Sequence, residues 1–407
     1  MGNLIIQNLL KKQNEIFLKK FIVGNKKRGK FYKENITINI LSPGRVNIIG
    51  EHTDYNLGLA ISVTVNKYIF LIGIIDNSNE VKIYSKYLNE HCKFSLDEIR
   101  YDKRTPWINY IKGVLREYIK HNYKIGGFSM IIDSNLPIAT GMSSSAALEV
   151  GIAKFIEELF NLKVDKKDTV KYCNSAENNF VGVKCGLLDQ FTVAYGKKDN
   201  AIFLNFKDLS YEYIPFNLGE NTILIIDSNE NRSLSDTEYN NRIDECKNAV
   251  KIISSITKDS RIKSLSDVSL DLLYRLEEKL PEKLFRRARH VVTENNRVLL
   301  LKESLLKGDI KKLGLILLKS HNSLKYDYEV STERLDFLVD EVTKLKWVYG
   351  ARLMGAGFGG SVISIVKKDK VSDIIEIMSK KFLEKFAEAP KFIECLPSDG
   401  TKRVDKT

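Results

Sequence analysis

Apolar and polar residues alternate along several short stretches of the first half of the chain, a pattern typical of strands with one buried face. In residues 36–50 we expect the strand to break into a turn at Ser42-Pro43-Gly44, because proline and glycine favour turns. A later strand should end at Pro137, which cannot donate to a sheet. The predicted strands are 36–50, 58–76, 80–85, 127–137, 201–206 and 221–228, followed by turn and strand in 350–368.

Apolar residues recur at helical spacing in 109–118, in 144–160 and from about Tyr239 to Leu345. A chain of 407 residues is too long for one hydrophobic core and predicts two to three domains. Strands and helices that mix without a repeat, in two halves, predict an α+β protein with a seam near residues 205–220. We place the two domains at residues 1–212 and 213–407.

Composition narrows the class of protein. Hydrophobic residues at 43% and charged residues at 29% are ordinary for a soluble globular chain. The strongest apolar run, residues 69–75, is far shorter than a membrane span, and the lysine-rich first 21 residues predict an amphipathic surface helix. Five scattered cysteines without a CxxC pair favour a cytoplasmic protein and argue against a zinc site.

The net charge of +12 could indicate nucleic-acid binding, but that function needs basic residues clustered on one face. Here the lysines are spread along the whole chain, which favours solvated surfaces and leaves room for attraction of a small polyanionic substrate. We therefore expect no nucleic-acid and no membrane partner.

The segment LPIATGMSSSAAL, residues 136–148, places a glycine and three serines directly before a predicted helix. The first turn of a helix leaves about four backbone N–H groups unpaired and carries partial positive charge, so it receives anions. A serine there could simply cap the helix. Three serines behind a glycine favour phosphate binding instead, although no GxxxxGK[ST] motif occurs in the chain.

This segment resembles the second motif of the GHMP small-molecule kinases. SPGRVNIIGEHTDYN at 42–56 resembles the galactokinase signature, and GARLMGAGFGGSV at 350–362 resembles the third motif of the superfamily. Four further segments, AENNFVGVKCGLLDQF, DSNENRSLSDTEYNNRIDECK, RARHVVTENNRV and SHNSLKYDYEVSTERLDFLV, resemble galactokinase segments in the same order. The resemblance covers about residues 38–404 and implies the two-domain GHMP kinase fold, ATP as phosphate donor and Mg²⁺ as metal.

A sugar site needs side chains that can both donate to and accept from hydroxyls, since a buried unpaired hydroxyl costs about 1–3 kcal/mol. GEHTD supplies four such side chains after an apolar strand, although a hydrophilic surface turn would also look this way. The resemblance implies that the sugar is bound by residues of this signature and of two later segments. The expected substrate-binding residues are Arg45, Glu51, His52, Thr53, Asp54, Gly186, Asp189 and Tyr239.

The resemblance also implies a pair of catalytic residues, Arg45 and Asp189. A carboxylate can accept the proton that a sugar hydroxyl loses as it attacks the γ-phosphate. Arg45 would keep Asp189 ionised and neutralise charge on the transferred group. On its own, Asp189 in GLLDQF would read as an ordinary aspartate at a helix start. Whether such an aspartate acts as a true base or positions the hydroxyl stays open.

For the nucleotide and the metal, the resemblance implies Glu177 as the metal carboxylate, with Ser145 as the hydroxyl ligand and Ser143 as the alternative. Trp107 would lie near adenine or be only a packed aromatic. The glycines of GAGFGG would permit positive φ and a close backbone approach to the nucleotide site. The expected nucleotide-binding residues are Trp107, Ala139, Thr140, Gly141, Met142, Ser143, Ser144 and Ser145.

Six positions depart from the usual family pattern without removing these groups: Leu57, Ala139, Thr140, Asn231, Arg232 and Met354. The expected activity is phosphorylation of the anomeric hydroxyl of D-galactose by a cytoplasmic, monomeric enzyme. Two alternatives remain: a 1-kinase for N-acetylgalactosamine or another galactose-like sugar, and a non-catalytic sensor of galactose and ATP. Sensors related to galactokinases tend to lose residues of the serine loop, which this chain keeps.

Overall fold

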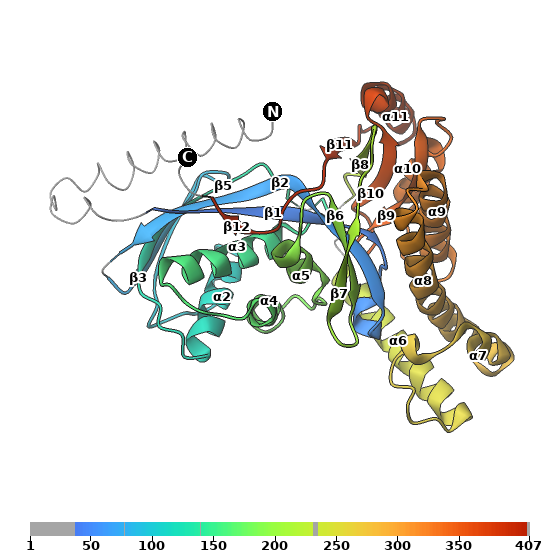
Figure 1. Ribbon diagram of the computed structural model, residues 1–407, viewed down its shortest axis with the longest axis horizontal. Coiled ribbons are helices and arrows are strands. Elements are labelled where there is room, and N and C mark those ends of the chain that lie inside the picture. The colour runs from blue at the N-terminus through green and yellow to red at the C-terminus, as the bar shows by residue number, and fades with distance from the viewer. Residues whose placement is uncertain (1–36, 77, 139, 231–234, 405–407) are drawn as a thin grey trace.

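The computed structural model describes residues 37–76, 78–138, 140–230 and 235–404. Its first sheet has the strand order β12-β1-β2-β5-β3-β4, with β6 pairing β2 and β7 pairing β6. Helices α2 to α5 lie together on one face of this sheet (Figure 1). The strands are β1 (Ile38–Ile49), β2 (Leu59–Ile75), β3 (Glu80–Ser85), β4 (Glu90–Ser95), β5 (Phe128–Ser134), β6 (Asn200–Asn205), β7 (Ser210–Pro215) and β12 (Lys402–Arg403). The helices are α2 (Ile108–Lys120), α3 (Ser144–Leu159), α4 (Lys166–Ser175) and α5 (Leu188–Tyr195), with a 3₁₀ turn η3 (Asp54–Asn56) and a π turn η4 (Ala176–Val181).

The second sheet is antiparallel, in the order β11-β8-β10-β9, and long helices stand beside it (Figure 1). Its strands are β8 (Asn221–Asp227), β9 (Val348–Met354), β10 (Ser361–Lys367) and β11 (Lys391–Cys395). The helices are α6 (Ser235–Thr257), α7 (Leu270–Arg275), α8 (Glu282–Leu306), α9 (Ile310–Tyr326), α10 (Glu333–Val342) and α11 (Val371–Phe386), with short turns η5 (Leu265–Asp267), η6 (Glu277–Lys279) and η7 (Lys368–Lys370). The helical pattern predicted from Tyr239 to Leu345 is thus confirmed.

The second sheet is buried on both faces. Along β8, Ile223 and Ile225 belong to the core of the first sheet, whereas Leu224 and Ile226 belong to the core under the C-terminal helices. A strand covered on both sides reads as a continuous apolar run, which explains the sequence of residues 221–228. Of the helices that the structure describes, none combines the length and the apolar content that crossing a membrane requires.

The predicted turn at Ser42-Pro43-Gly44 is wrong, because β1 runs through it and pairs β2 on both sides of a register shift between Pro43 and Gly44. The bulge accommodates a residue that has no N–H to donate. A Cβ on Gly44 would lie 2.5 Å from Leu136 Cδ1, so the glycine lets β1 approach the serine loop. The next residue, Arg45, donates its backbone N–H to Met142 O at 3.1 Å.

The chain passes from the first sheet to the second between the end of β7 at Pro215 and the start of β8 at Asn221. Strand β7 continues past residue 212 to Pro215, and β12 returns the end of the chain to the first sheet beside β1. The predicted helix over the first 21 residues lies outside the described residues.

Candidate active site

A cleft of about 320 Å³ lies where the two halves of the chain meet. Its walls come from the turn after β1, the serine loop before α3, the segment leading into α5, the start of α6 and the turn between β9 and β10. It brings together most of the site residues predicted from the sequence: Arg45, Glu51, His52, Asp54, Gly141, Met142, Ser143, Ser144, Ser145, Glu177, Gly186, Asp189 and Tyr239.

Arg45 and Asp189, which both line this cleft, form an ion pair. The Nη2 and Nε atoms of Arg45 lie 2.5 and 2.8 Å from Asp189 Oδ1, and Nη1 donates to Gly141 O at 2.6 Å. The hydroxyl of Ser143 donates to Asp189 Oδ2. The Arg45 side chain is 8% exposed and that of Asp189 26%, so the carboxylate is fixed by two partners and still faces the cleft.

The side chain of Ser143 does not cap helix α3, although the residue occupies the N-cap position. It stands at the N-cap of α3 with φ 52° and ψ 60°, and its side chain makes no cap hydrogen bond because it bonds Asp189 instead. A left-handed conformation costs a non-glycine residue about 1–3 kcal/mol, and such strain gathers at functional sites. The first-turn N–H groups of α3, beside Ser144 and Ser145, therefore remain available to an anion.

Glu51 and His52 tie the turn after β1 to the third motif. Glu51 Oε1 accepts from Gly355 N at 2.8 Å and from Arg352 Nη2 at 3.1 Å. Arg352 is fully buried and also donates to the backbone oxygens of Asn47 and Ile48, each at 2.6 Å. The second sheet thus holds the end of β1 in place.

Hydrogen bonding fixes the tautomer of His52. Its Nε2 donates to the carbonyl of Ala356 at 3.1 Å, so Nδ1 accepts from Tyr55 Oη at 2.8 Å. Tyr55 then accepts from Tyr328 Oη at 2.7 Å, and Tyr328 accepts from Cys246 Sγ at 3.1 Å. Burial lowers the pKa of His52 to about 3, so the ring is neutral. Both ring nitrogens of His52 are already hydrogen-bonded within the protein, so His52 lines the cleft with a ring of fixed orientation.

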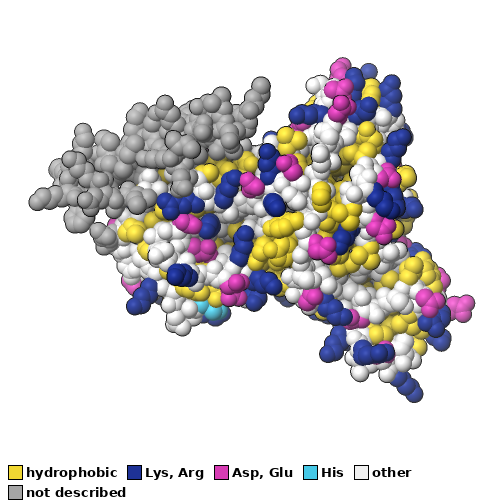
Figure 2. Space-filling view, viewed as in Figure 1, with side chains coloured by type: hydrophobic (Ala, Val, Ile, Leu, Met, Phe, Trp, Pro, Cys, Tyr) yellow, Lys and Arg dark blue, Asp and Glu magenta, His cyan; other side chains and the backbone are white. Residues whose placement is uncertain are grey.

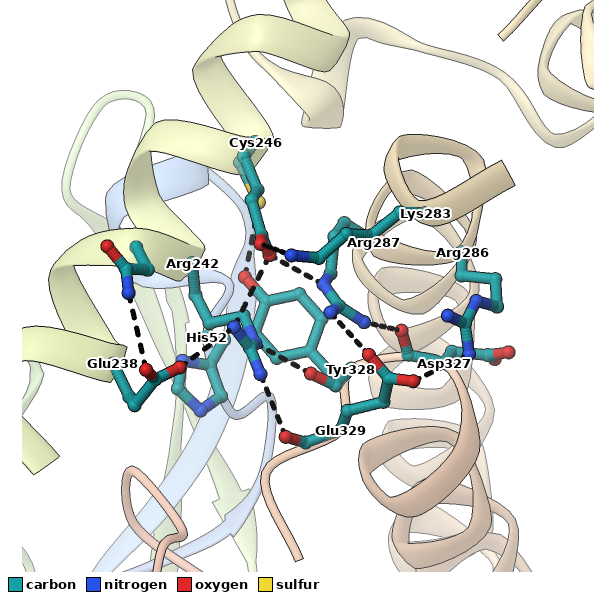
Figure 3. A network of polar contacts seen from close by, with 12 residues as sticks. His52, Glu238, Arg242, Cys246, Lys283, Arg286, Arg287, Asp327, Tyr328 and Glu329 are labelled. Atoms are coloured by element: carbon teal, nitrogen blue, oxygen red, sulfur yellow. Dashed lines mark hydrogen bonds and ion pairs between the residues drawn. The ribbon is translucent and has the colours of Figure 1, made fainter. Parts of the chain in front are cut away.

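A buried ionic network stands behind this chain of hydrogen bonds (Figure 3). Arg242 on α6 donates to Tyr328 O at 2.8 Å and to Glu329 O at 2.9 Å. The fully buried Arg287 on α8 bridges Glu245 and Glu329 at 2.7 and 2.6 Å. These bonds fasten α6 to α8 and to the segment that follows α9.

Asp54, Gly186 and Tyr239 line the same cleft as the ion pair. Burial raises the pKa of Asp54 to about 6, with Asp189 and Glu51 as further negative neighbours. A Cβ on Gly186 would lie 1.9 Å from Asp54 Oδ2, so the glycine leaves the space that this carboxylate occupies. Tyr239 packs edge-on against Tyr55 with ring centroids 5.4 Å apart, and burial raises the pKa of its hydroxyl far above the ordinary range.

Three predicted site residues do not line this cleft, and one lies outside the described residues. Thr53 is fully buried and donates its hydroxyl to Gly50 O and Leu59 O, each at 2.8 Å, so it closes the turn from within. Thr140 is buried, with its hydroxyl on Pro137 O and its carbonyl accepting from Ser361. Trp107 lines a second cavity, described below, and Ala139 is not among the described residues.

Glu177 lies on the π turn η4 that follows α4, a rare turn that is frequent at functional sites. Its carboxylate is 5% exposed, with Cys185 Sγ donating to Oε2 at 3.1 Å and Gln190 Nε2 donating at 2.6 Å. The Ser145 hydroxyl also hydrogen-bonds this carboxylate. Burial raises the pKa of Glu177, and no lysine or arginine of the described residues forms an ion pair with it.

The pair of Ser145 and Glu177 fits a magnesium ion that receives its other ligands from phosphates and water. Across the described part of the chain, no group of three or more His, Cys, Asp or Glu side chains could cage a metal alone. A hydroxyl and a carboxylate next to an anion-receiving helix end are the donor set that Mg²⁺ uses with a bound nucleotide.

Trp107 belongs to a mostly apolar cavity of about 210 Å³ that adjoins the cleft at Ser144 and Ser145. Its indole N–H donates to Glu90 Oε2 at 2.6 Å, which fixes the ring. The sequence assigned no role to the other apolar lining residues, which include Tyr87, Leu88, Ile138 and Leu148. Ile138 and Leu148 stand in the segment 136–148, whereas Tyr87 and Leu88 belong to no motif, and only the fold brings the four together.

Other cleft residues were also missed. Arg352, Ala356, Lys184 and Cys185 contact or line the site, but each is of a type common in any sequence. Arg352 stands two residues before Met354 in the third motif, which was the one available signal. The third motif itself was expected at the nucleotide side, and the structure places Gly355 and Ala356 against the sugar signature.

Among the described residues, the departures at Leu57, Thr140 and Met354 leave the cleft intact, whereas Ala139, Asn231 and Arg232 are not described by the structure. Leu57 adopts a left-handed φ of 54° and is 41% exposed, so it sits where a glycine would be unstrained. Met354 is fully buried in the core of the first sheet. The glycines 355, 357, 359 and 360 all have positive φ, between 80° and 114°, as predicted.

The fold and the serine loop define a class of small-molecule kinases. The family model of the GHMP kinase N-terminal domain matches residues 109–197 of the sequence, and the family model of the C-terminal domain matches residues 301–384. A mevalonate kinase structure shares the fold with a TM-score of 0.63 at 20% identity, covering 89% of this chain and 99% of that chain. The galactose-binding signature of galactokinases matches residues 29–73.

The particular family follows from closer relatives. The galactokinase of Thermotoga neapolitana is 39% identical over 90% of this chain and 100% of its own, and that of Pyrococcus furiosus is 41% identical over 89% and 98%. The structure of Lactococcus lactis galactokinase complexed with galactose is similar with a TM-score of 0.89 and 33% identity, covering 97% of this chain and 100% of that one. The chain belongs to the galactokinase family, and as a kinase it uses ATP.

Proposed function

We propose that the protein transfers the γ-phosphoryl group of ATP to the anomeric hydroxyl of D-galactose. The observation that carries this proposal is the placement of Asp189. Its carboxylate is held by Arg45 and Ser143 between the sugar signature on one side and the serine loop on the other. A sugar on the first side and a phosphate on the second would meet at this carboxylate.

In the proposed reaction the galactose hydroxyl gives its proton to Asp189 as its oxygen bonds to the γ-phosphorus. The bond from that phosphorus to the β–γ bridging oxygen breaks, and ADP leaves. Arg45 holds Asp189 as an ionised acceptor and offers positive charge beside the transferred group. A general base normally supplies ~10²–10⁴-fold in rate, and the size of this factor distinguishes proton transfer to Asp189 from orientation of the hydroxyl.

The sugar would lie against Glu51, Asp54 and Tyr239, which supply acceptors and a hydroxyl on one wall of the cleft. His52 orients the turn and also lines the cleft. A site that bonds an axial hydroxyl leaves buried groups unpaired when the hydroxyl points elsewhere, so galactose should exceed glucose in kcat/KM by at least about a hundredfold.

For the nucleotide, the adenine ring would occupy the apolar cavity at Trp107, and the phosphates would lie at the first turn of α3 beside Ser144 and Ser145. Ser145 and Glu177 would hold Mg²⁺, which when bound neutralises charge on the phosphates. Lys184 at the cleft mouth adds positive charge without an ion-pair partner among the described residues.

We also propose that the enzyme acts as a cytoplasmic monomer with no nucleic-acid partner. All five cysteines are free thiols, in keeping with a reducing compartment. On the face drawn in Figure 2, lysines and arginines are scattered among acidic side chains rather than gathered into a stripe. Light scattering at micromolar concentration would test the monomer.

The experiment that tests the proposed activity is an ATP-coupled screen over galactose, glucose, N-acetylgalactosamine, galacturonate and arabinose. We expect galactose to be the best substrate and its 1-phosphate to be the product. Equal or better kcat/KM on N-acetylgalactosamine would mean that the substrate is not galactose, while the protein would still be a sugar kinase. Galactose binding without turnover of any sugar would favour a sensor and contradict the proposal.

A further inference from the structure

The proposed metal carboxylate is linked to a second buried glutamate that no motif assigned. Glu149 lies on the second turn of α3 and is fully buried. Gln190, also fully buried, donates through Nε2 to Glu149 Oε2 at 2.9 Å and to Glu177 Oε2 at 2.6 Å. One amide nitrogen thus joins the two carboxyl groups.

In this pair of side chains, two buried atoms have no hydrogen-bond partner among the described residues: Glu149 Oε1 and Gln190 Oε1. Both are buried acceptors, and leaving one unpaired costs about 1–3 kcal/mol. They belong to a pair of side chains that already shares one hydrogen bond. A single proton on Glu149 Oε1 can be donated to Gln190 Oε1, which would pair both atoms and complete a cyclic acid–amide pair.

The surroundings of Glu149 favour that proton. The charged groups that act on it are Glu177 and Asp189, both negative, and no lysine or arginine of the described residues forms an ion pair with it. Burial raises the pKa of Glu149 well above its ordinary value, in agreement with a neutral carboxyl group. An ionised Glu149 would leave an uncompensated buried charge beside two others.

We propose that Glu149 is a neutral carboxylic acid that holds the Gln190 amide in one orientation and thereby positions the Glu177 carboxylate for the metal. Glu149 touches neither metal nor substrate and acts as a positioning residue. Gln190 has two N–H donors, and Glu149 fixes their direction by both giving and accepting a hydrogen bond. The second N–H of Gln190 then holds Glu177 Oε2 and leaves the rest of the carboxylate to Ser145 and the metal. This inference rests on the proposed metal role of Glu177.

The test separates a neutral acid from an ionised one. Glu149→Gln keeps one donor and one acceptor in nearly the same shape, so it should preserve the acid–amide pair. Glu149→Met keeps the volume and loses both hydrogen bonds. Glu157→Met is the matched control, because Glu157 is a half-buried glutamate on the same helix that binds Tyr118 and Thr169 instead.

Calorimetric titration with a non-hydrolysable ATP analogue, with Mg²⁺ and with a chelator, gives the gain in affinity due to the metal. Loss of a residue that orients a metal ligand typically costs about 10–100-fold in metal affinity, so Glu149→Met should reduce this gain at least about tenfold. Glu149→Gln and Glu157→Met should keep it, and galactose affinity should stay unchanged in all three variants. Melting temperatures report whether each variant is folded.

Infrared spectroscopy provides a readout that does not depend on the metal or on folding of the methionine variant. The wild-type protein should show the C=O stretch of a protonated carboxylic acid, and Glu149→Gln should lack it. If the Glu149→Gln spectrum differed from the wild-type spectrum only by the loss of a carboxylate band, the proposal would be overturned. The proposal would also be overturned if Glu149→Gln lost as much of the Mg²⁺-dependent gain in affinity as Glu149→Met. The same holds if Glu149→Met kept the full gain while Glu177→Ala lost it. If Glu177→Ala also keeps the gain, the proposed metal role fails, and the inference fails with it.

Discussion

A single added methyl group at Gly186 should disable the sugar site. The backbone at Gly186 is not in the left-handed region, so alanine is allowed there conformationally. Its Cβ would lie 1.9 Å from Asp54 Oδ2 and 2.7 Å from Asp54 Cγ. Ordinary contacts begin at 3.4 Å, so the carboxylate must move by about 1.5 Å, the difference between 3.4 and 1.9 Å. A misplacement of ~1 Å at an active site can cost ~10²-fold, and we expect a loss of about that size in kcat/KM for galactose.

Steady-state kinetics in galactose and in ATP measures this loss, and the KM for ATP should change little. Gly126→Ala is the control, because its Cβ would meet only Phe160 Cε1, at 3.6 Å. A double-mutant cycle with Asp54→Ala, read as galactose affinity, tests the route of the effect. If Gly186→Ala weakened binding as much in the Asp54→Ala background as in the wild type, or left galactose kinetics intact, the reasoning would be refuted.

Three further predictions concern the metal carboxylate Glu177, the protonation of Asp54 and the adenine site at Trp107. Glu177→Ala should weaken the use of Mg²⁺–ATP and leave galactose affinity nearly unchanged; lost sugar binding with intact Mg²⁺ dependence would assign Glu177 to the sugar pocket. Because the pKa of Asp54 is about 6, galactose affinity should fall as the pH drops through 6, and Asp54→Asn should bind weakly with no such fall. The same raised pKa means that ionised Asp54 costs stability above pH 6, so Asp54→Asn should stabilise the sugar-free protein in urea at pH 8, by at most about 3 kcal/mol, and not at pH 4. Trp107→Ala should raise the KM for ATP and not that for galactose, and an unchanged KM for ATP would make Trp107 a packing residue only.

The family and most of the fold could be predicted from the sequence, because both depend on local signals. The helix over residues 144–160 has a strong apolar period and is observed as α3 at Ser144–Leu159. The assignment to galactokinases, made from collinear motifs, is confirmed by relatives of about 40% identity. The turn at Pro43 failed because proline is a local turn signal, whereas pairing with β2 on both sides of a bulge is a tertiary effect.

The geometry of the site was harder to predict, since motifs name residues without assigning their partners. The hydroxyl of Ser143 could have capped α3, and only the fold brings it to Asp189, 46 positions later. Thr53 was grouped with its neighbours, yet its hydroxyl points into the turn. Arg352 and Glu149 were missed because a buried charge and a buried acid are recognisable only from their surroundings.

The most direct test of the account is the turnover of Asp189→Asn. This variant keeps the shape of the side chain and loses the carboxylate that would take the sugar proton. We expect it to fold, to bind galactose with nearly wild-type affinity, and to lose at least about a hundredfold in kcat, the lower end of the ~10²–10⁴ range for a general base. A folded variant that retains more than about a tenth of the wild-type kcat would contradict proton transfer to Asp189 as the basis of the reaction.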